Sequence, residues 1–125
     1  MKEAIFTKEA PDVIGPYSQA IQHGNMIFVS GQLPVTPSSG EIQSGDVREQ
    51  TRQSLDNLRA ILEKAGTDLS AVVKTTVFIQ NMSDFSSVNE IYSTYFSGTY
   101  PARTCVEVAR LPKNALVEIE AIAVR

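Results

Sequence analysis

A long amphipathic helix in the middle of the chain constrains the fold more than any other feature of the sequence. Asp46 is a favoured N-cap residue, Glu49 follows three positions later as a capping-box partner, and Gly66 is placed to end the helix. Side chains that can face a core recur between them at helical spacing: Val47, Thr51, Leu55, Leu58, Leu62 and Ala65. The pattern predicts a helix that packs one face against a hydrophobic core.

A central strand and a second helix follow. The run VVKTTVFI at residues 72–79 is β-branched and almost continuously apolar, which predicts a central strand covered on one face and paired on both edges. Ser83 and Asp84 can open a second helix, and Gly98 follows its end. The apolar side chains of this helix form one stripe, which is typical of core packing: Phe85, Val88, Tyr92, Tyr95 and Phe96.

Shorter apolar segments complete a predicted sheet. Residues 17–21 and 26–30 flank a tight turn and favour a hairpin, whereas residues 104–108 and 117–124 form two later strands. The segment 33–45 is rich in Pro, Ser and Gly and is expected to be a surface loop. The resulting order, β-β-α-β-α-β-β with about five strands, predicts an α+β fold.

Two helices can cover only one face of such a sheet. The other face would expose aliphatic side chains unless another copy of the chain covers it. Burial alone therefore predicts a homo-oligomer, with cyclic symmetry as the default.

Length and composition narrow the class of protein. The 125 residues are expected to form one domain, residues 1–125, and 42% hydrophobic residues allow a modest core. A net charge of −3 gives no basic footprint for nucleic acid. One cysteine, Cys105, excludes an intrachain disulfide, and with one histidine, His23, a structural metal site is not expected. No signal peptide or membrane span is visible, so a cytoplasmic location is expected.

The last two strands carry the charged residues that point to chemistry. By strand alternation, Arg103 shares a face with Cys105, and Glu118 shares a face with Glu120. If the two strands pair, a cation and two carboxylates converge. A solvated edge with a weak salt bridge is the alternative. The aliphatic strand VEIEAIAV at 117–124 favours a polar pocket or a wet interface for its glutamates, because a carboxylate is costly to bury.

Arg103 suits the binding of a small carboxylate. Its planar guanidinium follows the rigid Pro101 and can make two parallel hydrogen bonds to a keto, amino or imino acid. One glutamate would then be free for proton transfer. The alternative is that Arg103 only pairs internally with Glu118 or Glu120.

The remaining candidates give weaker signals. Cys105 has no predicted neighbour to lower its pKa, so a packed thiol is favoured over a nucleophile. His23 lies in the predicted turn and is expected to be exposed. Ser30 and Gly31 end a strand and could offer backbone N–H groups and a hydroxyl to an anion, although such sequences also serve turns. Tyr17 could line a pocket or simply pack.

Taken together, these residues resemble a known family. The segments that carry the resemblance are GPYSQA (15–20), SGQ (30–32), VVKTTVFI (72–79), VNEIY (88–92), PARTCVEVARLP (101–112) and VEIEAIA (117–123). They are similar, essentially from end to end, to the RidA or YjgF-like family of reactive-intermediate deaminases. The resemblance implies a chorismate-mutase-like α+β fold in a homotrimer, whose sheets form a central barrel with the helices outside.

The resemblance also implies an activity that needs no cofactor or metal. Family members hydrolyse 2-imino acids, such as 2-iminopropanoate and 2-iminobutanoate, to 2-oxo acids and ammonia, in clefts between subunits. Arg103 would bind the substrate carboxylate, Glu118 would position or deprotonate the attacking water, and the backbone near Cys105 would supply a carbonyl. Glu120 receives no role beyond pairing at the trimer interface. The pocket walls would come from Tyr17, Ser30, Gly31 and Asn89.

Some questions stay open at this point. The link at 96–100 is shorter than in many members of the family, which leaves the depth of the pocket undetermined. One alternative function is a non-catalytic trimer that binds 2-oxo acids or acts like a chaperone, but Glu118 would repel a bound carboxylate. An RNA-cleaving translation inhibitor is another, and the net charge of −3 argues against it.

Overall fold

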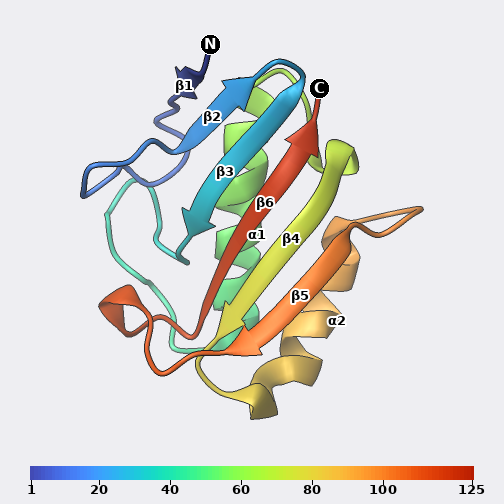
Figure 1. Cartoon of the computed structure of the whole chain (residues 1–125). Coiled ribbons are helices and arrows are strands. Elements are labelled where there is room, and N and C mark those ends of the chain that lie inside the picture. Colours follow the sequence, from blue (N-terminus) through green and yellow to red (C-terminus); the bar gives the residue numbers. More distant parts are fainter.

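The computed structural model describes all 125 residues as one sheet with two helices. The sheet has six strands in the order β1-β2-β3-β6-β4-β5 (Figure 1). Its strands are β1 (Glu3–Ile5), β2 (Ala20–His23), β3 (Met26–Gln32), β4 (Val72–Ile79), β5 (Ala102–Glu107) and β6 (Val117–Val124). Short 3-10 turns occur at Leu69–Ala71, Met82–Asp84 and Pro112–Asn114. The predicted α+β fold is confirmed.

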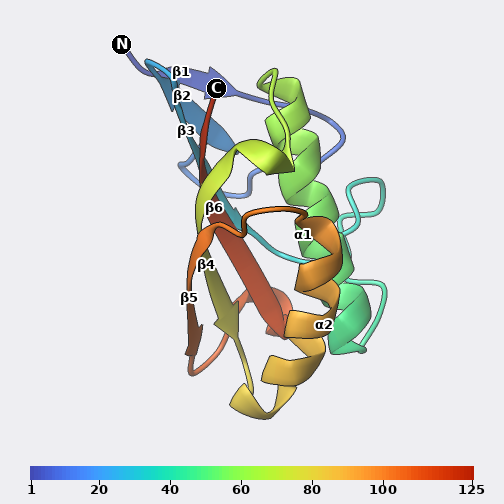
Figure 2. The same ribbon diagram turned by 90° about the vertical axis from the view of Figure 1, so that its right-hand side faces the viewer.

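Both helices, α1 (Val47–Lys64) and α2 (Phe85–Tyr95), cover the same face of the sheet (Figure 2). The core lies between this face and the helices. Its largest fully buried apolar side chains are Ile27, Leu55, Leu58, Ile61, Leu62, Val77, Ile79 and Ile119. Neither helix is long and apolar enough to cross a membrane.

The start of α1 differs from the prediction in one detail. The Asp46 side chain accepts a hydrogen bond from the Arg48 N–H at 2.8 Å, so Asp46 is the N-cap. Glu49 is not its capping-box partner, because the Glu49 carboxylate pairs with Arg52 at 3.1 Å. The Asp46 N–H instead donates to the Ser44 hydroxyl, which lies closer along the chain.

The short first strand was missed by the sequence prediction of about five strands. β1 pairs antiparallel with β2, with Ala4 opposite Ile21, and forms one edge of the sheet. A strand of three residues is too short to show alternation, and its conformation depends on pairing with its neighbour.

The loop at 33–45 is confirmed but is anchored more firmly than a surface loop requires. The buried Asn57 amide, from α1, donates to the carbonyl oxygens of Leu33 and Val35 at 3.0 and 2.9 Å. Val35 itself is buried in the core. One side of the loop is therefore held against the helix layer.

Candidate functional site

The two charged faces expected to converge lie on opposite sides of the sheet. β5 pairs with β4 in parallel and β6 pairs with β4 antiparallel, so β4 separates β5 from β6. Arg103 lies beside the buried Thr75, on the face that the helices cover, whereas Glu118 lies beside Phe78 on the open face. The two strands do not pair, so the condition under which Arg103 would meet the glutamates within one chain is not met. Alternation gives the two faces of a strand, but it does not identify the neighbouring strand.

Arg103 is held by α2 through polar and aromatic contacts. Its Nη1 donates to Asn89 Oδ1 at 2.6 Å. Its Cζ lies 4.9 Å from the centre of the Tyr92 ring and 5.4 Å from that of Phe85, within cation–π range. These contacts fix the plane of the guanidinium.

Arg103 also lines a shallow pocket of about 400 Å³. The pocket is lined by Asn89, Tyr92, Ser93, Tyr100, Pro101 and Arg103. The three ion pairs of the chain join Arg48 to Glu90, Arg52 to Glu49 and Arg59 to Asp56. Internal pairing of Arg103 with Glu118 or Glu120 is therefore wrong, and the cation is available for a carboxylate ligand.

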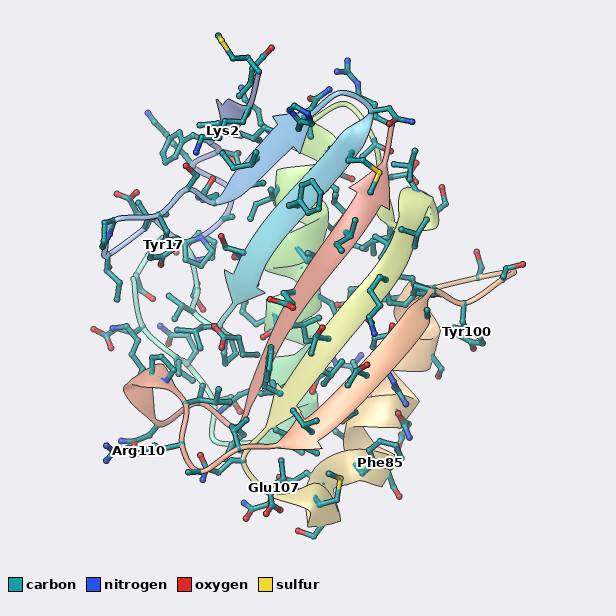
Figure 3. The ribbon with its side chains drawn as sticks, viewed as in Figure 1. Lys2, Tyr17, Phe85, Tyr100, Glu107 and Arg110 are labelled. Carbon is teal, nitrogen blue, oxygen red and sulfur yellow. The ribbon has the colours of Figure 1, made fainter.

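Tyr100 is a lining residue that the sequence interpretation did not identify. It is exposed on the link between α2 and β5, at the rim of the Arg103 pocket (Figure 3). The one signal that could have indicated it was its place directly before Pro101, three positions from Arg103.

Cys105 lies on the same face of β5 as Arg103 and packs against the core. Burial raises the pKa of its thiol, and the nearby Arg103 charge lowers it by a smaller amount. The thiol is therefore neutral near pH 7, as expected for packing rather than for nucleophilic attack.

The Glu118 carboxylate is half-buried on the open face and sits directly over Gly31. A Cβ added at Gly31 would lie 2.7 Å from Glu118 Oε2, so only glycine allows this placement without a shift. Glu118 accepts no hydrogen bond from its own chain. Burial raises the pKa of its carboxyl, and the negative charge of Glu120 raises it further. A carboxylate of this kind is a stronger base than an exposed one.

Tyr17 and Gly31 line a second pocket, of about 180 Å³, beside the N-terminal loop. Ser30 does not offer free donors there. Its hydroxyl donates to the Ser18 carbonyl oxygen at 2.6 Å, and its N–H donates to the Gln19 carbonyl oxygen at 2.9 Å. Both donors of Ser30 are therefore used within the chain, and a part for Ser30 and Gly31 in the pocket wall stays a prediction.

The candidate residues thus form two separate groups. We call Arg103, Asn89, Tyr92 and Tyr100 the clamp half, and Glu118, Gly31 and Tyr17 the base half. Tyr100 and Tyr17, one from each half, lie toward opposite edges of the sheet (Figure 3). One copy of the chain does not bring the two halves together.

The sequence matches a known family over most of its length. The profile of the family described as Endoribonuclease L-PSP matches residues 7–125. The chain belongs to this family, also known as RidA or YjgF-like. The resemblance seen in the sequence is thereby confirmed.

Relatives in the RidA family are similar along the whole chain. A RutC family protein of Pyrococcus horikoshii is 57% identical over 123 residues, which cover 98% of each chain. The 2-iminobutanoate/2-iminopropanoate deaminase of Escherichia coli is 54% identical over 128 residues, covering 100% of this chain and 99% of the relative. The crystal structure of E. coli TdcF with bound serine has a TM-score of 0.95 at 50% identity and covers 98% of both chains.

The other predicted polar residue, His23, stands apart from both halves of this RidA-family chain. It is exposed beside the β2–β3 turn, where Gly24 adopts a φ of +61°, as the sequence predicted. No group of three or more His, Cys, Asp or Glu side chains is placed to hold a metal ion.

Proposed function

We propose that this chain is a cofactor-independent hydrolase of small 2-imino acids, a 2-iminobutanoate/2-iminopropanoate deaminase. The observation that carries the proposal is the Arg103 guanidinium, oriented by Asn89 at 2.6 Å and left without an ion pair. The half-buried Glu118 supplies a candidate base. The E. coli relative that bears the same name, at 54% identity, supports this assignment.

The complete site is formed between copies in a homotrimer. Two features support this arrangement: the clamp half and the base half face opposite sides of the sheet, and the open face carries apolar side chains. Phe28 and Val106 on that face are 43% and 38% exposed in the single chain. Packing of the open faces would bury these side chains. Because Arg103 lies on the edge strand β5, the same packing can bring the clamp half of one copy beside the base half of the next at that edge.

The reaction balances with water as the only co-reactant. Water attacks C2 of the protonated imine while Glu118 accepts a proton from it, and a carbinolamine forms. Glu118 then returns the proton to the amino nitrogen. As the C–N bond breaks, Glu118 takes the remaining hydroxyl proton, so the C=O bond of the 2-oxo acid forms, and ammonia leaves with that proton as ammonium. The backbone carbonyl near Cys105 would hold the water or the imine nitrogen.

The two halves make different contributions to the rate. Arg103 holds the substrate carboxylate and so orients C2. Each charge-assisted hydrogen bond to the carboxylate contributes on the order of 1.5–3 kcal/mol of binding free energy. General acid–base transfer by Glu118 adds about 10²–10⁴-fold. A substrate that is already electrophilic needs no more than these two effects.

Two other functions are weaker. A pure binder of 2-oxo acids has no use for a carboxylate near its anionic ligand, because like charges repel. The family description points to RNA cleavage, but a net charge of −3 and a single, distant histidine do not suit a polyanionic substrate.

The first test is a coupled assay. Threonine dehydratase generates 2-iminobutanoate in solution, and formation of 2-oxobutanoate is followed with wild type, Arg103→Ala and Glu118→Gln. Wild type should accelerate release above the uncatalysed rate, and both variants should not. Arg52→Ala is the matched control, because its exposed ion pair lies on the outer side of α1 and contributes little. If wild type binds 2-oxobutanoate but does not accelerate its formation, the hydrolase function is wrong and the chain is a binder of 2-oxo acids.

A mixing experiment tests the placement of the site between copies. Arg103→Ala and Glu118→Gln chains, each inactive alone, are refolded together in equal amounts. If each site takes Arg103 from one copy and Glu118 from the next, about one quarter of the sites in random trimers are intact, so about a quarter of wild-type activity should return. A mixture that stays inactive, although its trimers contain both variants, would contradict a site shared between copies.

A further inference from the structure

Glu118 and Glu120 form a pair of carboxylates on the open face of β6. They are two positions apart, so their side chains stand next to one another on the same side of the strand, about 7 Å apart. Neither takes part in an ion pair, and neither accepts a hydrogen bond within the chain. Nothing in the chain accounts for the second carboxylate.

No cation of the same chain forms an ion pair with these two carboxylates. The one cation on the open faces of the neighbouring strands is Lys74 of β4, and its Nζ donates to Thr104 Oγ1 of β5 at 2.7 Å. The Lys74 ammonium is thereby held toward β5, although Lys74 and Glu120 line the same pocket on the open face. Asp12 and Lys113 line the neighbouring pocket that Gly31 shares, and they offset each other in charge.

On the other side of Glu118, the strands contribute no charge. The nearest groups on β3 and β4 are Gly31 and Phe78. Within one copy of the chain, Glu120 is therefore the charged group placed to act on Glu118, whereas the Arg103 that the proposed trimer sets near Glu118 comes from the next copy. Glu118 is half-buried and Glu120 is exposed, so solvent screens the charge of Glu120 less at Glu118 than it would between two fully exposed carboxylates. A negative neighbour is expected to raise the pKa of Glu118. The pKa of Glu118 is indeed raised, mainly by burial and further by the charge of Glu120.

We propose that Glu120 is a positioning residue for the deaminase reaction: its negative charge delays ionisation of Glu118 and so sets the acidic limit of activity. This inference rests on the proposed function of Glu118 as the base. A base that ionises nearer to neutral pH accepts a proton from water more readily, at the cost of activity in acid. Glu120 does not touch the substrate in this scheme.

The charge of Glu120 is removed in two ways, by Glu120→Gln and by the strand-favouring Glu120→Thr. The pH profile of kcat/KM is measured for each variant that remains folded and assembled by light scattering. Without the like charge, Glu118 ionises more easily, so the acidic limb should move to lower pH. For charges about 7 Å apart, an effective dielectric between those of water and of a protein surface gives a shift of about 0.4 to 1.7 pH units.

Two controls separate charge from structure. Glu120→Asp keeps the charge and should keep the limb near its wild-type position. Lys74→Met should move the limb by less than the neutral Glu120 variants do, and in the opposite direction, because the Lys74 ammonium is held by Thr104 on the far side of β4. A purely structural role of Glu120 would instead lower kcat/KM by the same factor at every pH.

A direct titration keeps this test separate from the proposed function. The Glu118 carboxyl resonance is followed by NMR against pH in wild type and in the neutral variants, and its midpoint should fall by the same amount as the limb. Unchanged midpoints in both neutral variants would overturn the inference, even with an active wild type. If wild type shows no deaminase activity at any pH, the proposed function is wrong, and the titration alone then decides whether Glu120 controls Glu118.

Discussion

Replacing Gly31 with alanine would test the placement of the Glu118 carboxylate. The new Cβ would lie 2.7 Å from Oε2 and 2.9 Å from Cδ of Glu118, whereas ordinary contacts begin at 3.4 Å. The carboxylate must therefore move by about 0.7 Å or more, the difference between 3.4 and 2.7 Å. Misplacement of a reacting group by about 1 Å can lower the rate by about 10²-fold. We expect kcat/KM to fall between about tenfold and a hundredfold.

The same substitution should leave the fold nearly unchanged. Gly31 does not adopt a positive φ, and the atoms it would displace are the end of a flexible side chain. The free energy of unfolding in urea should therefore change by less than about 1 kcal/mol. Gly45→Ala is the matched control, because no heavy atom lies within 4 Å of its added Cβ and its φ is not positive either.

Two results would refute this reasoning. Full activity in Gly31→Ala would mean that the position of the Glu118 carboxylate over Gly31 does not matter for the reaction. A large loss of stability would mean that the backbone, and not the side chain of Glu118, absorbs the contact.

Three other substitutions test separate parts of the structure. Thr75→Val removes the hydroxyl that bonds the buried Tyr92 Oη at 2.7 Å, so urea unfolding should show a loss of about 1–3 kcal/mol, and an unchanged midpoint would contradict the bond. Cys105→Ala should retain deaminase activity, and because burial raises the pKa of the thiol, iodoacetamide should label native wild type more slowly than the unfolded chain at pH 7. Glu118→Gln should be inactive yet more stable than wild type at pH 7. The raised pKa of Glu118 means that its contribution to stability is complete below its ordinary value of 4.5 and is lost as pH rises through the raised value, so the two urea midpoints should coincide near pH 4 and separate at pH 7.

The helices could be predicted because their signals are local. Asp46, the spacing of apolar residues and Gly66 all lie within or beside α1, and the structure confirms the cap and the end of this helix. The predicted capping box is wrong for an equally local reason. The Asp46 N–H donates its hydrogen bond to the Ser44 hydroxyl, and Glu49 forms an ion pair with Arg52. β1 was missed because its conformation comes from pairing with β2, which no local pattern of three residues records.

The site could be predicted only in part, because it depends on strand order. Alternation correctly placed Arg103 with Cys105 and Glu118 with Glu120, since it is a property of a single strand. The chain then passes through α2 between β4 and β5, which makes that pair parallel and puts β5 at the edge beyond β4. The position of β4 between the charged strands is a property of topology, and no spacing along the sequence contains it.

That topology also limits what motion within one chain could achieve. Rotamer changes of Arg103 and Glu118 cannot join them, because their backbones are fixed by the hydrogen bonds of β4 and their side chains leave opposite faces of the sheet. Joining them within one copy would require breaking a central strand pair, which is the most stable part of such a sheet. A second copy can supply the missing half without breaking any hydrogen bond. The exposed Phe28 and Val106 supply the apolar area for that contact. In the proposed trimer, assembly and catalysis are coupled through the same sheet, because a change that weakens packing of the open face would also separate Arg103 from the Glu118 of the next copy.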